Sequence, residues 1–201
     1  MALHTAPSFE AIEKLARTRD ADLVGRRMVD PRLNRGRGAQ TNHTGRFERE
    51  TREAFDDGWG GEESGTEAPK ALATVEHIER ARSIITRNQS PDIGFDRSIN
   101  AYRGCEHGCS YCFARPTHAY LGHSAGIDFE RDIYVKVNAP DLLRRELGDR
   151  RYRPKPIAMG TNTDPYQPAE RQHRLTRQIL EVLLETRHPV TICTKSALVV
   201  R

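Results

Sequence analysis

The chain has 201 residues, enough for one domain with a core of useful size, alone or with a tail. No apolar run is long enough to cross a bilayer, and the first residues lack the basic and apolar regions of a secretory signal, so we expect a cytoplasmic protein. The formal net charge of +4 is too small an excess to imply nucleic-acid binding by itself.

The first 90 residues favour irregular or disordered structure. They hold 15 of the 32 basic and 15 of the 28 acidic residues, so the positive excess falls in the second half. One amphipathic helix is expected at 8–16, followed by Gly-rich, charged stretches at 34–39 and 56–65. Three arginines near the first of these stretches could contact phosphates, although a solvated linker is the favoured interpretation: Arg32, Arg35 and Arg37.

From residue 91 onward, strand and helix patterns alternate. Strands are expected at Ser98–Arg103, Asp132–Val137, Pro156–Gly160 and Pro189–Thr194, with a further element from Ala197. Helices are expected after an Asn138 cap, ending near Gly148, and from Ala169 to Arg187 with an apolar stripe at Leu175, Ile179, Val182 and Leu183. This order is typical of a parallel sheet, where ligands collect at the carboxyl ends of the strands.

The strongest local signal is three cysteines in eight residues, Cys105, Cys109 and Cys112, spaced C-x3-C-x2-C. Without a secretory signal, this spacing favours metal ligands or redox groups over disulfides. A structural zinc site would need His107 or Cys193 as its fourth ligand. A thioredoxin-like pair leaves Cys105 unexplained, and a c-type haem would need His directly after Cys112. A ferredoxin-type cluster needs four cysteines, and only the distant Cys193 could complete it.

A further interpretation makes use of the missing fourth ligand. Three thiolates on a 4Fe-4S cluster leave one iron open for the amino and carboxylate groups of S-adenosylmethionine. The cluster can cleave that molecule reductively to a 5′-deoxyadenosyl radical. Gly104 and Gly108 permit the tight turns that such a loop requires. Tyr111 could pack near the adenine, or it could belong to the core.

The cysteine spacing and four other segments resemble the radical S-adenosylmethionine (radical SAM) superfamily. The resemblance is to the branch related to spore photoproduct lyase and, within it, to bacterial radical SAM proteins of uncharacterised function. It covers roughly residues 35–201. The segments that carry it are Gly36–Glu48, Asn100–Arg115, Val135–Ala139, Gly160–Glu170 and Thr194–Ser196.

This resemblance implies a partial (β/α)6, TIM-like barrel, of which about three βα units are present, with an iron–sulfur cluster at its open end. It implies metal binding by Cys105, Cys109 and Cys112, and a reductant such as flavodoxin or ferredoxin. The family's Gly-Gly-Glu type loop is replaced here by other possible cofactor contacts, for which an ordinary turn is an equal alternative: Gly160, Thr161, Asn162, Thr163 and Asp164. Lys195 and Ser196 could face the cofactor or substrate, and a surface position for Lys195 is an equal alternative.

Four other side chains near these motifs carry expectations of their own. We expect Cys193 to be a small buried hydrophobe and His107 to be a solvated loop residue. Arg103 and Arg115 flank the cysteines, where they could balance negative charge or hold an anionic group of a substrate.

Two functions follow as hypotheses. The first is a radical SAM enzyme of lyase-like type, with an unknown substrate for which a nucleic acid is conceivable. The second is a zinc-stabilised nucleic-acid-binding module without catalysis. A six-unit barrel needs about twice the units found here, and the sequence stops at Arg201 without a cap, so we expect a C-terminally truncated chain with an open sheet edge. Turnover of the unknown substrate by this chain alone is therefore not expected.

Overall fold

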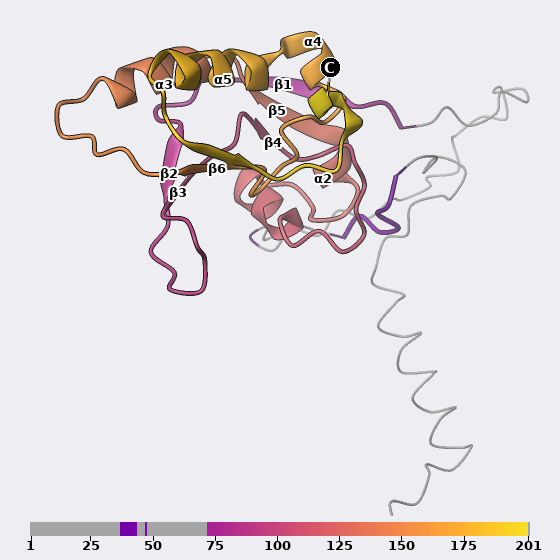
Figure 1. Ribbon diagram of the computed structural model, residues 1–201. Helices are drawn as coiled ribbons and strands as arrows, with labels where there is room; N and C mark the ends of the chain where they lie inside the picture. The colour runs from indigo at the N-terminus through magenta and orange to yellow at the C-terminus, as the bar shows by residue number, and fades with distance from the viewer. Residues whose placement is uncertain (1–36, 44–46, 48–71, 201) are drawn as a thin grey trace, which may run out of the picture.

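The computed structural model describes residues 37–43, 47 and 72–200, which form a mixed α/β fold with two open sheets (Figure 1). One sheet has the strand order β1 (Val75–Glu79), β5 (Asp132–Lys136), β4 (Tyr102–Arg103). The other has the order β2 (Ile85–Arg87), β3 (Arg97–Ile99), β6 (Ile157–Met159), β7 (Val190–Ile192). Both sheets are mixed: β1–β5, β3–β6 and β6–β7 are parallel, whereas β2–β3 and β4–β5 are antiparallel. Neither sheet closes into a barrel within these residues.

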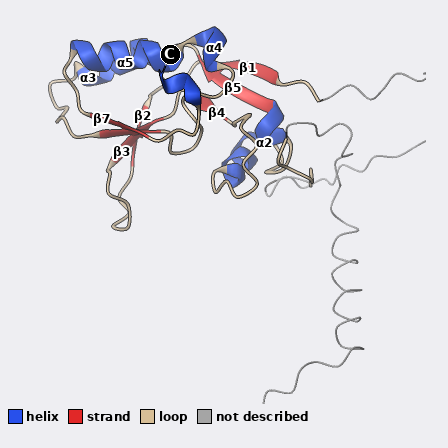
Figure 2. Cartoon of the chain, turned by 45° about the vertical axis from the view of Figure 1, so that its right-hand side comes forward, coloured by secondary structure: helices blue, strands red, loops and turns tan. Residues whose placement is uncertain are grey.

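The two longest helices lie on one side of the strands (Figures 1 and 2). The helix bounds are α2 (Asp128–Arg131), α3 (Ala139–Leu147), α4 (Glu170–His173) and α5 (Leu175–Glu185), with 3-10 helices η1 (Arg115–Leu121) and η2 (Ala197–Val200). Figures 1 and 2 show α3 and α5 side by side above the sheets. None of the helices in the described part of the chain is long and apolar enough to span a membrane.

The core forms where α3 and α5 cover the strands. The predicted stripe of α5 is buried, and it packs in one cluster with apolar residues of α3, β5 and β6. Its central members are completely or almost completely inaccessible: Leu143, Ile157, Met159, Ile179, Val182 and Leu183. The helical spacing of the apolar stripe in the sequence therefore predicted the buried face of α5 correctly.

The long helix expected from Ala169 to Arg187 is two helices. Arg174, between α4 and α5, has a left-handed φ of 51°. The buried Glu170 carboxylate explains the break, because it accepts the backbone N–H groups of Thr176 at 3.0 Å and Arg177 at 3.2 Å. It also accepts the Tyr102 hydroxyl. A side chain of α4 thus satisfies the free N–H groups at the start of α5.

The strand expected at Ser98–Arg103 is also divided, because β3 and β4 belong to different sheets. Where the chain passes from one sheet to the other, the Asn100 side chain forms hydrogen bonds with Thr161 Oγ1 at 2.9 Å and with the Asn162 N–H at 3.0 Å.

Asn138 precedes α3 as expected, but its side chain does not cap the helix. It instead exchanges two hydrogen bonds with the Ala81 backbone, at 3.0 and 2.9 Å.

Regular structure begins before the boundary that we expected at residue 91. β1 and β2 lie within the region expected to be irregular, and each pairs with a strand of the second half. Residues 37–43 also contact that half, so Arg37 does not lie in a solvated linker. The expected helix at 8–16, the stretch at 56–65, and both Arg32 and Arg35 lie outside the described residues.

Replacing Leu183 by Ala should lower the free energy of unfolding by about 2–5 kcal/mol, because the change leaves a cavity in the core. The neighbouring Leu184→Ala is the matched control, since Leu183 is 2% exposed and Leu184 77% exposed. Its effect should stay within about 0.5 kcal/mol. Urea unfolding followed by circular dichroism measures both, and equal losses would contradict this core assignment.

His118 should make stability depend on pH. It is 0% exposed, neither ring nitrogen has a hydrogen-bond partner among the described residues, and burial lowers its pKa to about 4. Because the unfolded chain binds this proton more readily, stability should be full above about pH 6.5 and fall as the pH drops towards 4. The total loss from this group should be on the order of 3 kcal/mol.

The comparison of unfolding free energies between wild type and His118→Leu from pH 7 to pH 4 isolates this contribution. The leucine variant should lose less stability over that range, since it cannot take up the proton. Parallel curves for the two proteins would remove His118 as the cause.

Candidate functional site

The three clustered cysteines line one cavity of about 230 Å³ at the carboxyl ends of β6 and β7. Its walls come from the cysteine loop, from the 160–164 loop after β6, and from residues 193–195 after β7. Each of these segments follows a strand, and the structure brings all three to one place. The position follows from the parallel pairing of β6 and β7, which puts their carboxyl ends at the same sheet edge.

The cysteine loop is held in a defined conformation. Gly104 and Gly108 have left-handed φ values of 78° and 61°, which meets the turn requirement expected at these positions. The Cys105 N–H bonds the Phe129 carbonyl at 2.9 Å, and the Cys112 N–H bonds the Cys109 carbonyl at 3.2 Å.

All three cysteines carry free thiols in the structure. Cys105 is buried, whereas Cys109 and Cys112 are half-buried. Burial raises the pKa of the Cys105 thiol to about 11, although backbone N–H groups of Asp164 and His107 act in the opposite direction by bonding its sulfur. A metal that binds this sulfur would therefore displace a proton from it.

The donor types at the cavity suit soft metal chemistry. Within residues 37–43, 47 and 72–200, no three His, Cys, Asp or Glu side chains converge as ligands of a single ion. Thiolates are ligands of both zinc ions and iron–sulfur clusters in proteins, so the three thiols that line the cavity are compatible with either hypothesis.

The Asp164 carboxylate connects the loop after β6 to the residues after β7 by hydrogen bonds. One carboxylate oxygen accepts the Tyr166 N–H at 2.8 Å and the Thr194 hydroxyl at 2.7 Å, and the other accepts the Lys195 N–H at 3.0 Å. The chains also approach closely here, since a Cβ added to Gly160 would lie 2.0 Å from the Cys193 carbonyl oxygen. Asp164 therefore shapes the cavity with bonds inside the protein.

The other predicted residues of the 160–164 loop differ in whether their side chains are available to bind a ligand. Thr163 is buried and donates to the Gly104 carbonyl at 2.6 Å, while Thr161 bonds the Asn100 side chain. Asn162 is exposed at the cavity, and its side-chain amide makes no hydrogen bond to the described residues. Asn162 is thus the polar side chain of this loop that remains available to a ligand.

Lys195 also lines the cavity. Its Nζ donates to the His107 carbonyl at 3.0 Å, and a hydrogen bond to the Cys109 side chain raises the Lys195 pKa. Tyr111 and Ser196 do not line the cavity. Tyr111 is 85% exposed, and the Ser196 hydroxyl accepts the Leu198 N–H at 3.3 Å.

Two expectations about neighbouring residues are wrong. Cys193 is exposed at the cavity rim, because β7 is an edge strand of the described sheet and leaves its outer side uncovered. His107 is only 18% exposed at its side chain, and burial lowers its pKa. Its Nε2 lies 3.5 Å from an Asp164 carboxylate oxygen without forming a hydrogen bond. The sequence position of His107 between Cys105 and Cys109 could have indicated that its side chain lines the cavity.

The guanidinium groups of the two flanking arginines bond to other groups of the protein. Arg103 makes a two-pronged ion pair with Glu79, with both N–O distances 2.9 Å. Arg115 donates to the Cys109 carbonyl from two nitrogens, at 3.1 and 2.8 Å. Sequence reasoning missed Phe113 and Thr194, which complete the cavity wall through their positions next to predicted residues.

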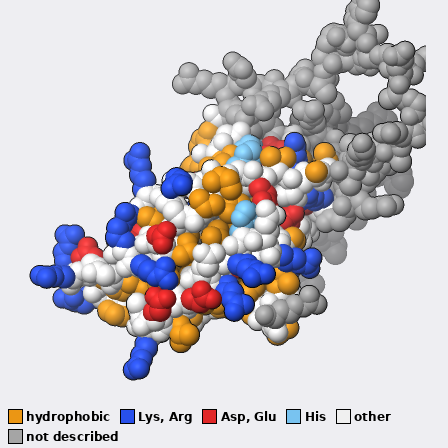
Figure 3. Space-filling view, turned by 90° about the horizontal axis from the view of Figure 1, so that it is seen from above, with side chains coloured by type: hydrophobic (Ala, Val, Ile, Leu, Met, Phe, Trp, Pro, Cys, Tyr) orange, Lys and Arg blue, Asp and Glu red, His pale blue; other side chains and the backbone are white. Residues whose placement is uncertain are grey.

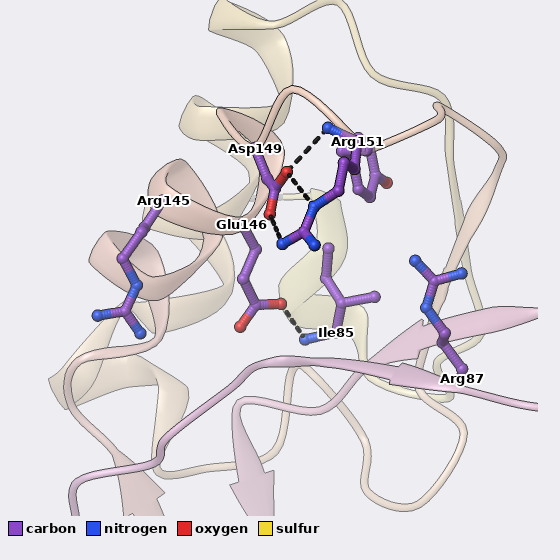
Figure 4. A pocket seen from close by; sticks show the side chains of 7 residues that line it. Ile85, Arg87, Arg145, Glu146, Asp149 and Arg151 are labelled. Atoms are coloured by element: carbon purple, nitrogen blue, oxygen red, sulfur yellow. Dashed lines mark hydrogen bonds and ion pairs between the residues drawn. The ribbon is translucent and has the colours of Figure 1, made fainter.

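A larger cavity of about 510 Å³ lies near the beginning of β6, beside β2 and the end of α3 (Figure 4). Arg87, Arg145 and Arg151 line it, but Arg151 is paired with Asp149 at 3.3 Å. Figure 3 shows further Lys and Arg side chains at the left end of the molecule, where Figure 1 places the loop after α3. This larger cavity shares no lining residue with the cysteine cavity and contains none of its thiols.

Comparisons with known proteins find relatives but no function. No protein-family model matches the chain, and no solved structure matches it. It is 46% identical over 107 residues to uncharacterised proteins of Mycobacterium tuberculosis and Mycobacterium bovis, a match covering 53% of this chain and 32% of each relative. It is 34% identical over 103 residues to an uncharacterised protein of Methanocaldococcus jannaschii, covering 51% of this chain and 36% of that protein. The chain thus matches about a third of the length of these relatives.

Replacing Asp164 by Asn should loosen the cavity wall at Lys195. The amide can keep one acceptor oxygen, but its NH2 group would then face the Lys195 N–H. We expect about tenfold faster hydrogen exchange at the Lys195 amide, measured by NMR, because the hydrogen bond that protects this amide is lost.

The matched control is Asp149→Asn, whose carboxylate bonds Arg151 outside the cavity. It should leave exchange at Lys195 unchanged. An unchanged rate in Asp164→Asn as well would show that this carboxylate does not hold the two loops together.

Proposed function

We propose that this chain carries the cluster-binding part of a radical SAM enzyme. The observation that carries the proposal is the shared cavity of Cys105, Cys109 and Cys112, set at the carboxyl ends of two parallel strands. The resemblance of the surrounding motifs to that superfamily agrees with it. The zinc-binding module remains the competing hypothesis.

A partial (β/α)6 barrel is the fold that we propose for the longer architecture. The β6, α4–α5, β7 segment is a parallel strand–helix–strand unit of the kind that such barrels repeat. Its strand ends lead into Gly160 and Cys193, both at the cavity. The antiparallel pairings of β2 and β4 are additions to this pattern.

We assign Cys105, Cys109 and Cys112 to the cluster as its thiolate ligands. When bound, a 4Fe-4S cluster supplies an electron for reductive cleavage of S-adenosylmethionine, with flavodoxin or ferredoxin as the type of reductant required. Cys105 would lose a proton on binding, and the Lys195 ammonium beside Cys109 would offset part of the added negative charge.

The remaining cavity residues would orient S-adenosylmethionine and exclude water. Asn162 offers an unoccupied amide, whereas Asp164 and Thr163 hold the shape of the loop. Phe113 and Ala114 add apolar wall to the cavity. A nucleic-acid substrate stays a prediction.

Anaerobic reconstitution with iron and sulfide tests the proposal. The full chain should bind about four irons and four sulfides and turn brown. With dithionite and S-adenosylmethionine it should release 5′-deoxyadenosine, measured by chromatography. Cys109→Ser should lose most of the iron, because one of its three thiolates is missing.

Cys193→Ser is the control, since Cys193 lies at the same cavity but outside the C-x3-C-x2-C run. It should keep wild-type iron content. Colourless protein that binds one zinc ion under the same conditions would overturn the proposal and support the zinc-binding module.

A further inference from the structure

We propose that Glu130 is a positioning residue for the cysteine loop and that residues 37–42 form a strap that locks this loop in place. The inference deepens the proposed function, because the strapped loop is the one assigned to the cluster. It gives the Arg-Gly motif around Arg37 a role that no pattern in the sequence indicated.

Glu130 is the centre of this arrangement. Its side chain, from α2, is 0% exposed. Its carboxylate accepts the backbone N–H groups of Gly38 at 3.0 Å and Ala39 at 2.8 Å, and it also accepts the Arg115 guanidinium. A buried carboxylate requires such charged and polar partners, so these groups depend on one another.

Arg115 transmits this contact to the cysteine loop. While it pairs with Glu130, it donates two hydrogen bonds to the Cys109 carbonyl and one to the Gly126 carbonyl at 3.1 Å. The planar guanidinium fixes the directions of its donors. The orientation set by Glu130 therefore determines where the Cys109 backbone is held.

The strap lies directly on the loop. A Cβ added to Gly38 would be 1.8 Å from the Gly108 carbonyl oxygen, and one added to Gly126 would be 1.9 Å from the Thr41 carbonyl oxygen. The Ile127 N–H bonds that Thr41 oxygen at 3.1 Å. Only glycine allows these two close backbone approaches.

Both ends of the strap are held by side-chain hydrogen bonds. At one end, the Arg37 guanidinium bonds the Glu130 carbonyl, the Leu72 carbonyl at 3.1 Å and the Thr74 hydroxyl at 2.8 Å. At the other, the Asn42 amide donates to the Asp128 carboxylate at 3.0 Å. With these bonds made inside the protein, Arg37 acts as an anchor and not as a phosphate contact.

Thiol reactivity of the metal-free full chain tests the positioning role. Each cysteine's alkylation rate with iodoacetamide is followed by peptide mass spectrometry in wild type, Glu130→Gln and Gly38→Ala. Both variants should react about fivefold or more faster at Cys109, because the loop opens more often. Cys193, outside the strapped loop, should keep its wild-type rate.

Gly94→Ala is the matched control for Gly38→Ala, since a Cβ at Gly94 meets nothing within 4 Å. It should leave all four rates unchanged. A wild-type Cys109 rate in both test variants, or an equal rise at Cys109 and Cys193, would overturn the positioning role.

Reconstituted protein gives the second readout. After S-adenosylmethionine is added, the reduced Gly38→Ala protein should give an altered electron paramagnetic resonance signal, whereas Gly94→Ala should match wild type. If wild type binds no iron but the thiol rates change as expected, the proposed function fails and the strap stands. If wild type binds iron and the thiol rates do not change, the strap fails and the proposed function stands.

Discussion

The buried Glu130 carboxylate joins three parts of the chain that are far apart in sequence. It receives backbone N–H groups from the segment at 38–39 and the guanidinium of Arg115, which in turn holds the Cys109 carbonyl. A charge buried this completely is stable only when its partners stay in place, and removal of one partner costs about 3–5 kcal/mol. The conformation of the cysteine loop therefore depends on contacts made outside the loop.

A second carboxylate, that of Asp164, holds another wall of the cavity. Asp164 accepts two hydrogen bonds that link the loop after β6 to the residues after β7, and Gly160 lets the two segments approach closely. The parallel pairing of these strands provides the frame, and α5 covers them on the other side. Two of the segments that line the cavity, the cysteine loop and the 160–164 loop, are thus each held by hydrogen bonds to an acidic side chain. Such support keeps donor groups at fixed positions, which a site for a metal group requires.

Hydrophobic spacing predicted much of the regular structure. The α5 stripe, the α3 helix and the strands β5, β6 and β7 occur close to where the pattern indicated, because burial of one helix face or of a whole strand leaves a local periodic signal. The breaks at Arg174 and Asn100 left no such signal. The Asn100 break depends on a hydrogen bond to Thr161, 61 residues away, and the Arg174 break depends on a hydrogen bond from the Thr176 backbone to the Glu170 side chain. Hydrophobic spacing encodes neither bond.

The sequence by itself determined the three-cysteine run, the strand-end positions of the polar loops, and the glycines that turn the loop. Each of these is a short-range property of neighbouring residues. Only the tertiary structure decided that Cys193, His107 and Phe113 join the same cavity, that Tyr111 faces away from it, and that residues 37–42 pack on the cysteine loop. These outcomes depend on strand pairing and on buried hydrogen bonds between segments up to 93 residues apart, and such pairings have no local pattern.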